Sequence, residues 1–162
     1  MKPTLIIGYG NFDRQDDGVA WHVLVGVAKR LGRAAPASPN EDFPLSTESP
    51  DFRFELQLTP ELAEDVAQYD RVCFVDAHTG AVPNDVNVET LTGEFQSSPF
   101  THHLTASTLL SFAETLYGAR PEAILVSVRG YEFGFERALS DRAASLAEEA
   151  AERIVAWINS GV

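Results

Sequence analysis

The chain has 162 residues, 44% of them hydrophobic and 22% charged, which is typical of a globular domain with a sizeable core. Its formal net charge of −12 argues against nucleic acid and anionic membranes as partners, because both attract clustered lysine and arginine. The single cysteine excludes an internal disulfide, and no apolar run suits a signal peptide or a membrane span, so we expect one cytoplasmic domain over residues 1–162.

The first half of the chain is predicted to begin with a buried strand over Pro3–Tyr9 and a helix that ends before Gly32. The segment Arg33–Asp51 is rich in proline, serine and acids, which predicts a long surface loop. Hydrophobic and polar residues then alternate over Phe52–Leu58, which indicates a strand with one solvated face. Thr59 as cap and Pro60 as first helical residue predict a short helix that ends near Tyr69.

The second half is predicted to alternate strands and helices in the same way. The expected elements are a central buried strand over Arg71–Ala77, an edge strand over Asp85–Leu91, a helix over Leu104–Tyr117, a strand over Ala123–Val128 and a helix capped by Ser140 that runs to about Ile158. This order predicts an α/β fold, a three-layer α/β/α sandwich whose twisted, mostly parallel five-stranded sheet has helices on both faces. The alternating strands are expected at its edges.

Polar residues follow three of these elements, at places where a parallel sheet would gather them at the carboxyl ends of its strands. Asn11, Asp13, Asp16 and Asp17 follow the first strand, Asp76 and His78 end the central strand, and His102 and His103 precede a helix. Two carboxylates and an imidazole are suitable ligands for a divalent transition metal. A cation would also relieve the repulsion between neighbouring carboxylates.

Each of these residues also has a structural interpretation that the sequence leaves open. Asp17 is as well explained by a favourable interaction with a helix dipole, and Asp76 by capping of a turn. The histidine pair before a helix is more typical of capping or of the surface. His22 is expected to pack or face solvent, and Cys73 to act as a small buried hydrophobic residue.

The turn GYGNFD also invites comparison with a dinucleotide-binding loop. Gly8 and Gly10 fit that pattern, but Asp13 stands where the third glycine is needed close to the pyrophosphate. The added carboxylates would repel phosphate. We therefore expect no nucleotide affinity from this turn.

Four segments, in this order, resemble the sequence blocks of the hydrogenase maturation proteases. GYGNFDRQDDGVA resembles a G-x-G-N turn followed by D-[DE]-G, and LTPELAEDVAQYDRVCFVDA resembles a block that ends in the D-A of the central strand. THHL resembles a block with a histidine two residues before a leucine, and SVRGYEFGFERALS resembles a late loop with a glycine and an L-S helix cap. The blocks span most of the chain.

This resemblance implies an endopeptidase that removes the C-terminal extension of a nickel–iron hydrogenase large-subunit precursor after nickel insertion. It implies that Asp17, Asp76 and His102 contact the nickel, which the precursor carries, and that Asp17 and Asp76 are also catalytic. His103 competes with His102, and His78 is a possible fourth ligand or orienting partner. No organic cofactor is implied, and a monomer is expected. The alternatives are a non-catalytic nickel-binding accessory protein for hydrogenase assembly and a nucleotide-binding domain.

Overall fold

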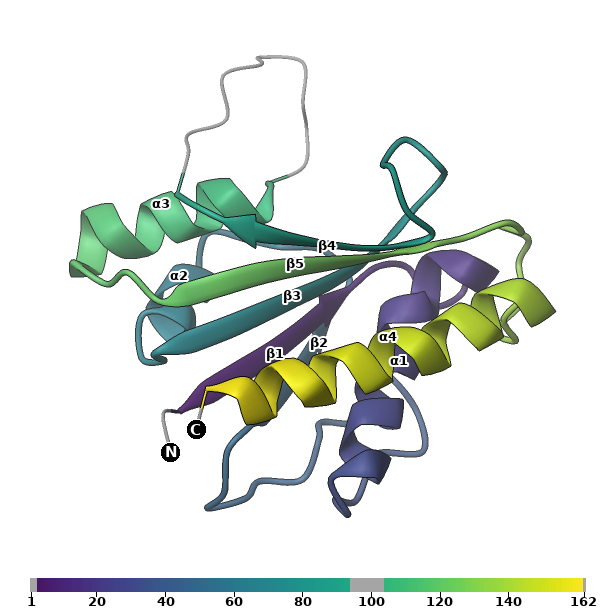
Figure 1. Ribbon diagram of the computed structural model, residues 1–162, viewed down its shortest axis with the longest axis horizontal. Helices are drawn as coiled ribbons and strands as arrows, with labels where there is room; N and C mark the ends of the chain where they lie inside the picture. Colours follow the sequence, from purple (N-terminus) through teal and green to yellow (C-terminus); the bar gives the residue numbers. More distant parts are fainter. Residues whose placement is uncertain (1–2, 94–103, 162) are drawn as a thin grey trace.

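Five strands form one mixed sheet in the computed structural model, which describes residues 3–93 and 104–161. The strands are β1 (Thr4–Tyr9), β2 (Asp51–Glu55), β3 (Arg71–His78), β4 (Val86–Leu91) and β5 (Glu122–Arg129), and their order across the sheet is β2-β1-β3-β5-β4 (Figure 1). All neighbouring pairs are parallel except β4 with β5. The prediction of a mostly parallel sheet with the all-apolar β3 at its centre and alternating strands at its edges is confirmed.

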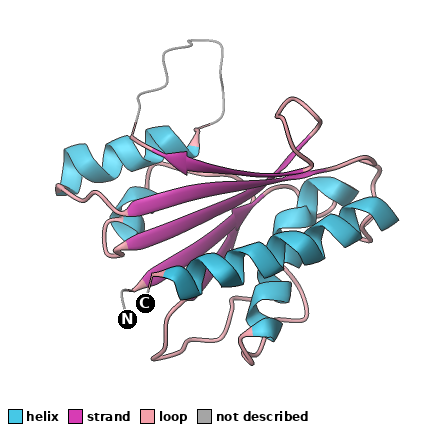
Figure 2. Ribbon diagram, in the orientation of Figure 1, coloured by secondary structure: helices cyan, strands magenta, loops and turns pink. Residues whose placement is uncertain are grey.

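Helices cover both faces of this sheet (Figure 2). They are the short 3-10 helix η1 (Gln15–Gly18), α1 (Val19–Arg30), α2 (Leu62–Val66), α3 (Ala106–Tyr117) and α4 (Asp141–Ser160). The helices α1 and α4 pack together on one face, and α2 and α3 pack together on the other. The three-layer sandwich expected from the sequence is therefore observed.

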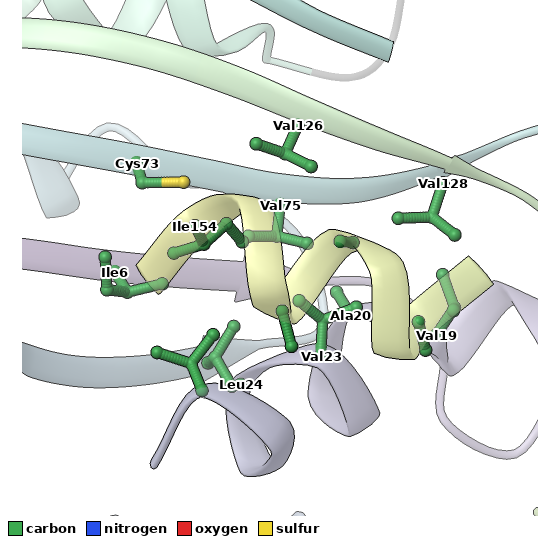
Figure 3. Close-up of a cluster of buried hydrophobic side chains, with 14 of the residues drawn as sticks. Ile6, Val19, Ala20, Val23, Leu24, Cys73, Val75, Val126, Val128 and Ile154 are labelled. Carbon is green, nitrogen blue, oxygen red and sulfur yellow. The ribbon is translucent and has the colours of Figure 1, made fainter. Parts of the chain in front are cut away.

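The two hydrophobic cores follow from the alternation of side chains along the strands. Between the sheet and the α1–α4 layer, Ile6, Val75 and Val126 contact the apolar faces of the two helices (Figure 3). Successive residues point to the other face, where Ile7 and Phe74 pack under α2 and α3. Cys73 is fully buried in the first of these cores, as expected of a small hydrophobic residue.

The end of α3 after Tyr117 and the cap of α4 at Ser140 agree with the predictions. The Thr105 side chain accepts a hydrogen bond from the Thr108 amide at the start of α3, and Gly118 ends that helix with φ 68°. The Ser140 hydroxyl accepts a hydrogen bond from the Ala143 amide, which caps α4 as predicted.

Two local predictions around β2 are wrong. The strand ends at Glu55 rather than Leu58, because its partner β1 ends at Tyr9 and the Gly10 amide makes the last bond to the Glu55 carbonyl. Helix α2 begins at Leu62, with Glu61 instead of Thr59 at the cap. The carbonyls of residues 59 and 60 accept from the amides of residues 62 and 63, so a tight turn precedes the helix.

Candidate functional site

A row of four polar side chains crosses the sheet near the carboxyl ends of its parallel strands. Backbone register places Asp76 beside Ser127 and Ser127 beside Asn87, and the Tyr9 hydroxyl donates to Asp76 Oδ2 at 3.1 Å. By strand alternation, all four lie on the face covered by α2 and α3. The rows nearer the amino ends of the parallel strands on this face are mainly apolar. We call Tyr9, Asp76, Ser127 and Asn87 the polar row.

Asp76 is the carboxylate of this row, and its hydrogen bonding is incomplete. Its Oδ1 atom is buried and has no hydrogen-bond partner among the described residues, while Oδ2 has the Tyr9 hydroxyl. Burial raises the pKa of Asp76 to about 6, although the neighbouring Ser127 and Tyr9 hydroxyls act in the opposite direction. A carboxyl group that titrates near neutral pH can both accept and return a proton.

Tyr9 supplies the hydroxyl that holds one Asp76 oxygen in place. Burial, together with the Asp76 charge, raises the pKa of Tyr9 well above its ordinary value. Tyr9 therefore stays protonated at neutral pH and acts as a donor. Tyr9 was not predicted as a site residue, although its place at the end of the first strand, beside the central strand, was a usable signal.

The turn after β1 positions Asp17. Gly10 has φ 148°, and a Cβ there would lie 2.1 Å from the Asp17 carbonyl oxygen, so only glycine fits. The Asn11 amide donates to Asp17 Oδ2 at 2.8 Å, and Asn11 Oδ1 accepts from the Asp13 amide at 3.0 Å. These two amides are therefore already bonded within the turn, which supports the expectation that it does not cradle phosphate.

Asp17 and Asp76 lie at the same end of the sheet. Asp17 belongs to η1, which packs against β3, and both carboxylates are bonded to the segment where the chain leaves β1, Asp76 at Tyr9 and Asp17 at Asn11. Asp17 is not in the first turn of the long helix, because α1 begins at Val19. Its carboxylate instead accepts a hydrogen bond from the Asn11 amide in the turn after β1.

Asp16 has a different environment from its neighbour. It is fully buried, and its two oxygens accept hydrogen bonds from the amides of Tyr131, Glu132 and Ser140 and from the Ser140 hydroxyl, at 2.6–3.0 Å. Burial alone would raise the pKa of Asp16, but these hydrogen bonds together lower it. We call this set the Asp16 network; it ties the first turn to the loop before α4.

The loop before α4 fits this network closely. A Cβ at Gly130 would lie 2.9 Å from the Asp16 Cβ and 2.7 Å from the Phe133 ring, so the backbone can approach Asp16 only without a side chain. The glycine of the late loop and the Ser140 cap were predicted from the sequence. The close approach of Gly130 to Asp16 and the hydrogen bonds from Ser140 to Asp16 were not.

His78 is engaged by the turn that follows β3. Its Nδ1 accepts from the Gly80 amide at 2.9 Å, so its Nε2 carries the proton and donates to the Asp85 carbonyl at 3.1 Å. Both ring nitrogens are therefore used by the backbone, and His78 orders its own loop instead of offering a ligand atom. His22 is half-buried and stacks on Phe12 with ring centroids 5.3 Å apart, which agrees with the packing role expected for it.

The remaining predicted ligands, His102 and His103, lie outside the described residues. The described part of the chain contains no group of three or more histidine, cysteine, aspartate and glutamate side chains arranged to hold a metal ion. Helix α3, which begins four residues after His102, packs on the face that carries the polar row. The three-residue set Asp17, Asp76 and His102 stays a prediction.

Several solved structures with a similar fold are described as hydrogenase maturation proteases or endopeptidases, from bacteria and from archaea. The hydrogenase maturating endopeptidase HybD from E. coli is 21% identical, with a TM-score of 0.65 over 99% of this chain and 94% of that one. The [NiFe] hydrogenase maturation protease HycI from Thermococcus kodakarensis KOD1 is 20% identical, with a TM-score of 0.63 over 98% and 93%. A hydrogenase 2 maturation peptidase from Thaumarchaeota archaeon SCGC_AB-539-E09 is 20% identical, with a TM-score of 0.58 over 98% and 99%.

These likenesses establish that the chain has the fold seen in hydrogenase maturation proteases over nearly its whole length. No protein-family model matches the chain, and no curated protein matches it. In the parts that the structure describes, every helix is too short or too polar to span a membrane.

Proposed function

We propose that this protein is a hydrogenase maturation endopeptidase that removes the C-terminal extension of a nickel–iron hydrogenase large-subunit precursor. The observation that carries the proposal is Asp76, a carboxylate with a buried, unpartnered oxygen and a pKa near 6 at the carboxyl end of the sheet. Solved structures with the same fold are named as enzymes of this kind. The resemblance of the four sequence blocks points to the same activity.

Asp76 and Asp17 have separate roles in the proposed reaction. Asp76 accepts a proton from the water that attacks the scissile carbonyl, and it returns that proton to the leaving amine as the peptide bond breaks. The Tyr9 hydroxyl keeps Asp76 Oδ2 fixed, so Oδ1 is the atom available to water or metal. Asp17, held by the Asn11 amide, presents its other carboxylate oxygen to the substrate.

Recognition of the precursor is proposed to depend on the nickel that it carries. Asp17, Asp76 and His102 contact that nickel, and the contact fixes the scissile peptide against the site. Orientation of this kind lowers the barrier of the chemical step. His103 is the alternative third contact. The protein acts as a cytoplasmic monomer, and the metal is part of its substrate.

Incubation of the purified protein with nickel-loaded precursor, and separately with metal-free precursor, tests the proposal by intact-mass spectrometry. A single C-terminal cut in the loaded sample alone supports both the activity and the recognition of nickel. A cut in both samples keeps the endopeptidase and removes nickel recognition from Asp17, Asp76 and His102.

A nickel-loaded precursor that stays uncut in the presence of its own maturation partners contradicts the endopeptidase. Binding without cutting would then assign the protein to the non-catalytic accessory class. A matched control is Asp51→Asn, which removes a carboxylate from the amino end of β2, away from the polar row. This variant is expected to process the precursor at the wild-type rate.

A further inference from the structure

An aromatic ring is displayed to solvent beside the candidate site. Phe135 is 87% exposed and lies in the loop that joins β5 to α4, at the right in Figure 1. The Arg14 guanidinium lies over this ring, 4.7 Å from its centre. We call these two side chains the Phe135–Arg14 patch. Single exposed hydrophobic residues are common, so the significance of this one depends on how it is held and on what lies next to it.

The loop is held in shape by the turn that carries Asp17. The Arg14 guanidinium donates twice to the Phe133 carbonyl, at 3.1 and 3.0 Å. The Gln15 amide donates to the Glu136 carbonyl at 2.8 Å, and Gln15 Oε1 accepts from the Gly134 amide at 3.1 Å. These bonds fix the backbone on both sides of Phe135, so the exposed ring is presented by an ordered loop.

Gln15 adopts a conformation that costs free energy. Its φ of 54° is the only positive value among the non-glycine residues that the structure describes. Such a conformation persists where surrounding contacts determine it, and it tends to occur near functional sites. Here it directs the Gln15 amide and side chain to the loop on either side of Phe135. An ordered loop that displays an exposed aromatic ring is thus held by a turn whose backbone is strained.

Arg14 adds a positive charge to the patch. No carboxylate lies within ion-pair distance of Arg14 in the described part of the chain, although the whole chain has a net charge of −12. The Arg14 carbonyl accepts from the Asp17 amide at 3.2 Å. The ring and the unpaired cation are therefore within one turn of the candidate site.

We propose that the Phe135–Arg14 patch docks the protein substrate, with Phe135 entering an apolar pocket on the precursor and Arg14 pairing with a carboxylate at the pocket's rim. This inference rests on the proposed function. The precursor is the chosen occupant because a chain brought to Asp17 passes beside the patch. Rigid aromatic rings and arginines with free donors are the residue types that contribute most to protein interfaces.

Steady-state processing of nickel-loaded precursor by Phe135→Ala tests the docking role. We expect KM to rise at least ~10-fold while kcat changes less than ~2-fold, because the ring is expected to bind without touching the reacting atoms. Phe135→Trp is expected to restore KM, since it keeps a flat aromatic ring. Arg14→Gln is expected to raise KM and to weaken the dependence of KM on salt.

The matched control is Leu116→Ala. Leu116 is 64% exposed and lies near the C-terminal end of α3, at the opposite end of the sheet in Figure 1. This variant is expected to keep the wild-type KM. Melting temperatures of all variants are measured so that a loss of fold is not mistaken for a loss of docking.

The docking role and the proposed function can fail separately. If wild-type protein cuts the precursor and Phe135→Ala has the same KM, the docking role is overturned and the endopeptidase stands. If wild-type protein cuts nothing, calorimetry of precursor binding decides: equal affinities of wild type and Phe135→Ala overturn docking, and a ~10-fold loss supports it. If the wild-type protein is a dimer and the Phe135→Ala variant is a monomer, the ring serves self-association and the docking proposal is overturned.

Discussion

The Asp16 network and the polar row contain two acids at the same end of the sheet whose carboxylates are satisfied to very different degrees. Asp16 accepts four hydrogen bonds, and its pKa is lowered. Asp76 has an orphaned oxygen, and its pKa is raised to about 6. A satisfied carboxylate stabilises the fold, whereas an unsatisfied one costs free energy unless a substrate, metal or proton completes it. The contrast supports a structural role for Asp16 and the chemical role that we propose for Asp76.

The largest expected effect is on activity at Asp76. Asp76→Asn keeps the shape of the side chain and removes its ability to accept a proton, so we expect processing of the precursor to fall by ~10³-fold. Stability at pH 7.5 is expected to stay equal or to increase, because a buried charge is removed. Processing rates and urea unfolding measured together check this. A variant that processes normally would remove Asp76 from the reaction.

The next effect is on stability at Asp16. Asp16→Asn replaces one acceptor oxygen by an NH₂ group that faces backbone donors, so we expect the free energy of unfolding to fall by about 3 kcal/mol. The amide hydrogens of the loop before α4 should exchange faster with solvent, since these amides lose their acceptor. Urea unfolding and hydrogen exchange of Tyr131 and Glu132 check this. If Asp16→Asn unfolds like wild type, the contrast between the two acids fails.

The pH dependence of stability should have opposite signs for the two acids. The raised pKa of Asp76 means that the folded state holds its proton more tightly, so this stabilisation is complete below about pH 4 and is lost as pH rises through about 6. Between pH 4.5 and 7.5 wild type should therefore lose about 2 kcal/mol relative to Asp76→Asn. Because the pKa of Asp16 is lowered in the folded state, Asp16 stabilises the fold at pH values above its ordinary pKa. This stabilisation is lost as the pH falls through the pKa of Asp16 in the folded protein.

Urea unfolding of wild type and both variants at several pH values measures these slopes. A wild-type curve parallel to that of Asp76→Asn would show that Asp76 is solvated in the folded protein, contrary to the structure. Because the two acids act in different pH ranges, each variant serves as the control for the other.

The sequence predicted the position of Asp76 in the fold well and the geometry of the first turn less well, for physical reasons. An acid at the end of a buried apolar strand lies at the carboxyl end of that strand, so its position follows from its own segment and does not depend on the neighbouring strands. Asp16 and Asp17 are adjacent in a 3-10 turn, where successive side chains point about 120° apart, so one is buried and the other is not. The direction of that rotation depends on the loop before α4, more than 100 residues away.

The same reasoning explains the missed contacts of β2 and Tyr9. The end of β2 depends on where its partner β1 leaves the sheet, and the bond from Tyr9 to Asp76 depends on the register of β1 with β3. The periodicity of one segment predicts neither the end of its partner strand nor the register between strands. The fold class was predictable because the order of strands and helices alone limits it.

The smallest expected effect is at Tyr9. Tyr9→Phe removes the hydrogen bond from the Tyr9 hydroxyl to Asp76 Oδ2 and keeps the ring, so the carboxylate should lose this orienting contact without loss of packing. Groups that orient a metal-contacting carboxylate typically contribute ~10-fold to affinity or rate. We expect processing to fall about 10-fold, with a change of less than about 1 kcal/mol in unfolding free energy.

Tyr69→Phe is the matched control for this substitution, because the Tyr69 hydroxyl also donates to a carboxylate, Asp51 Oδ2 at 2.6 Å, beside the amino end of β2. Equal losses of processing in the two variants would mean that removing any such hydroxyl disturbs the protein generally. A loss in Tyr9→Phe alone, with both variants equally stable, ties the effect to the orientation of Asp76. It would also show that the incomplete hydrogen bonding of Asp76 is an arrangement that the fold maintains, since a neighbour holds one oxygen while the other stays available.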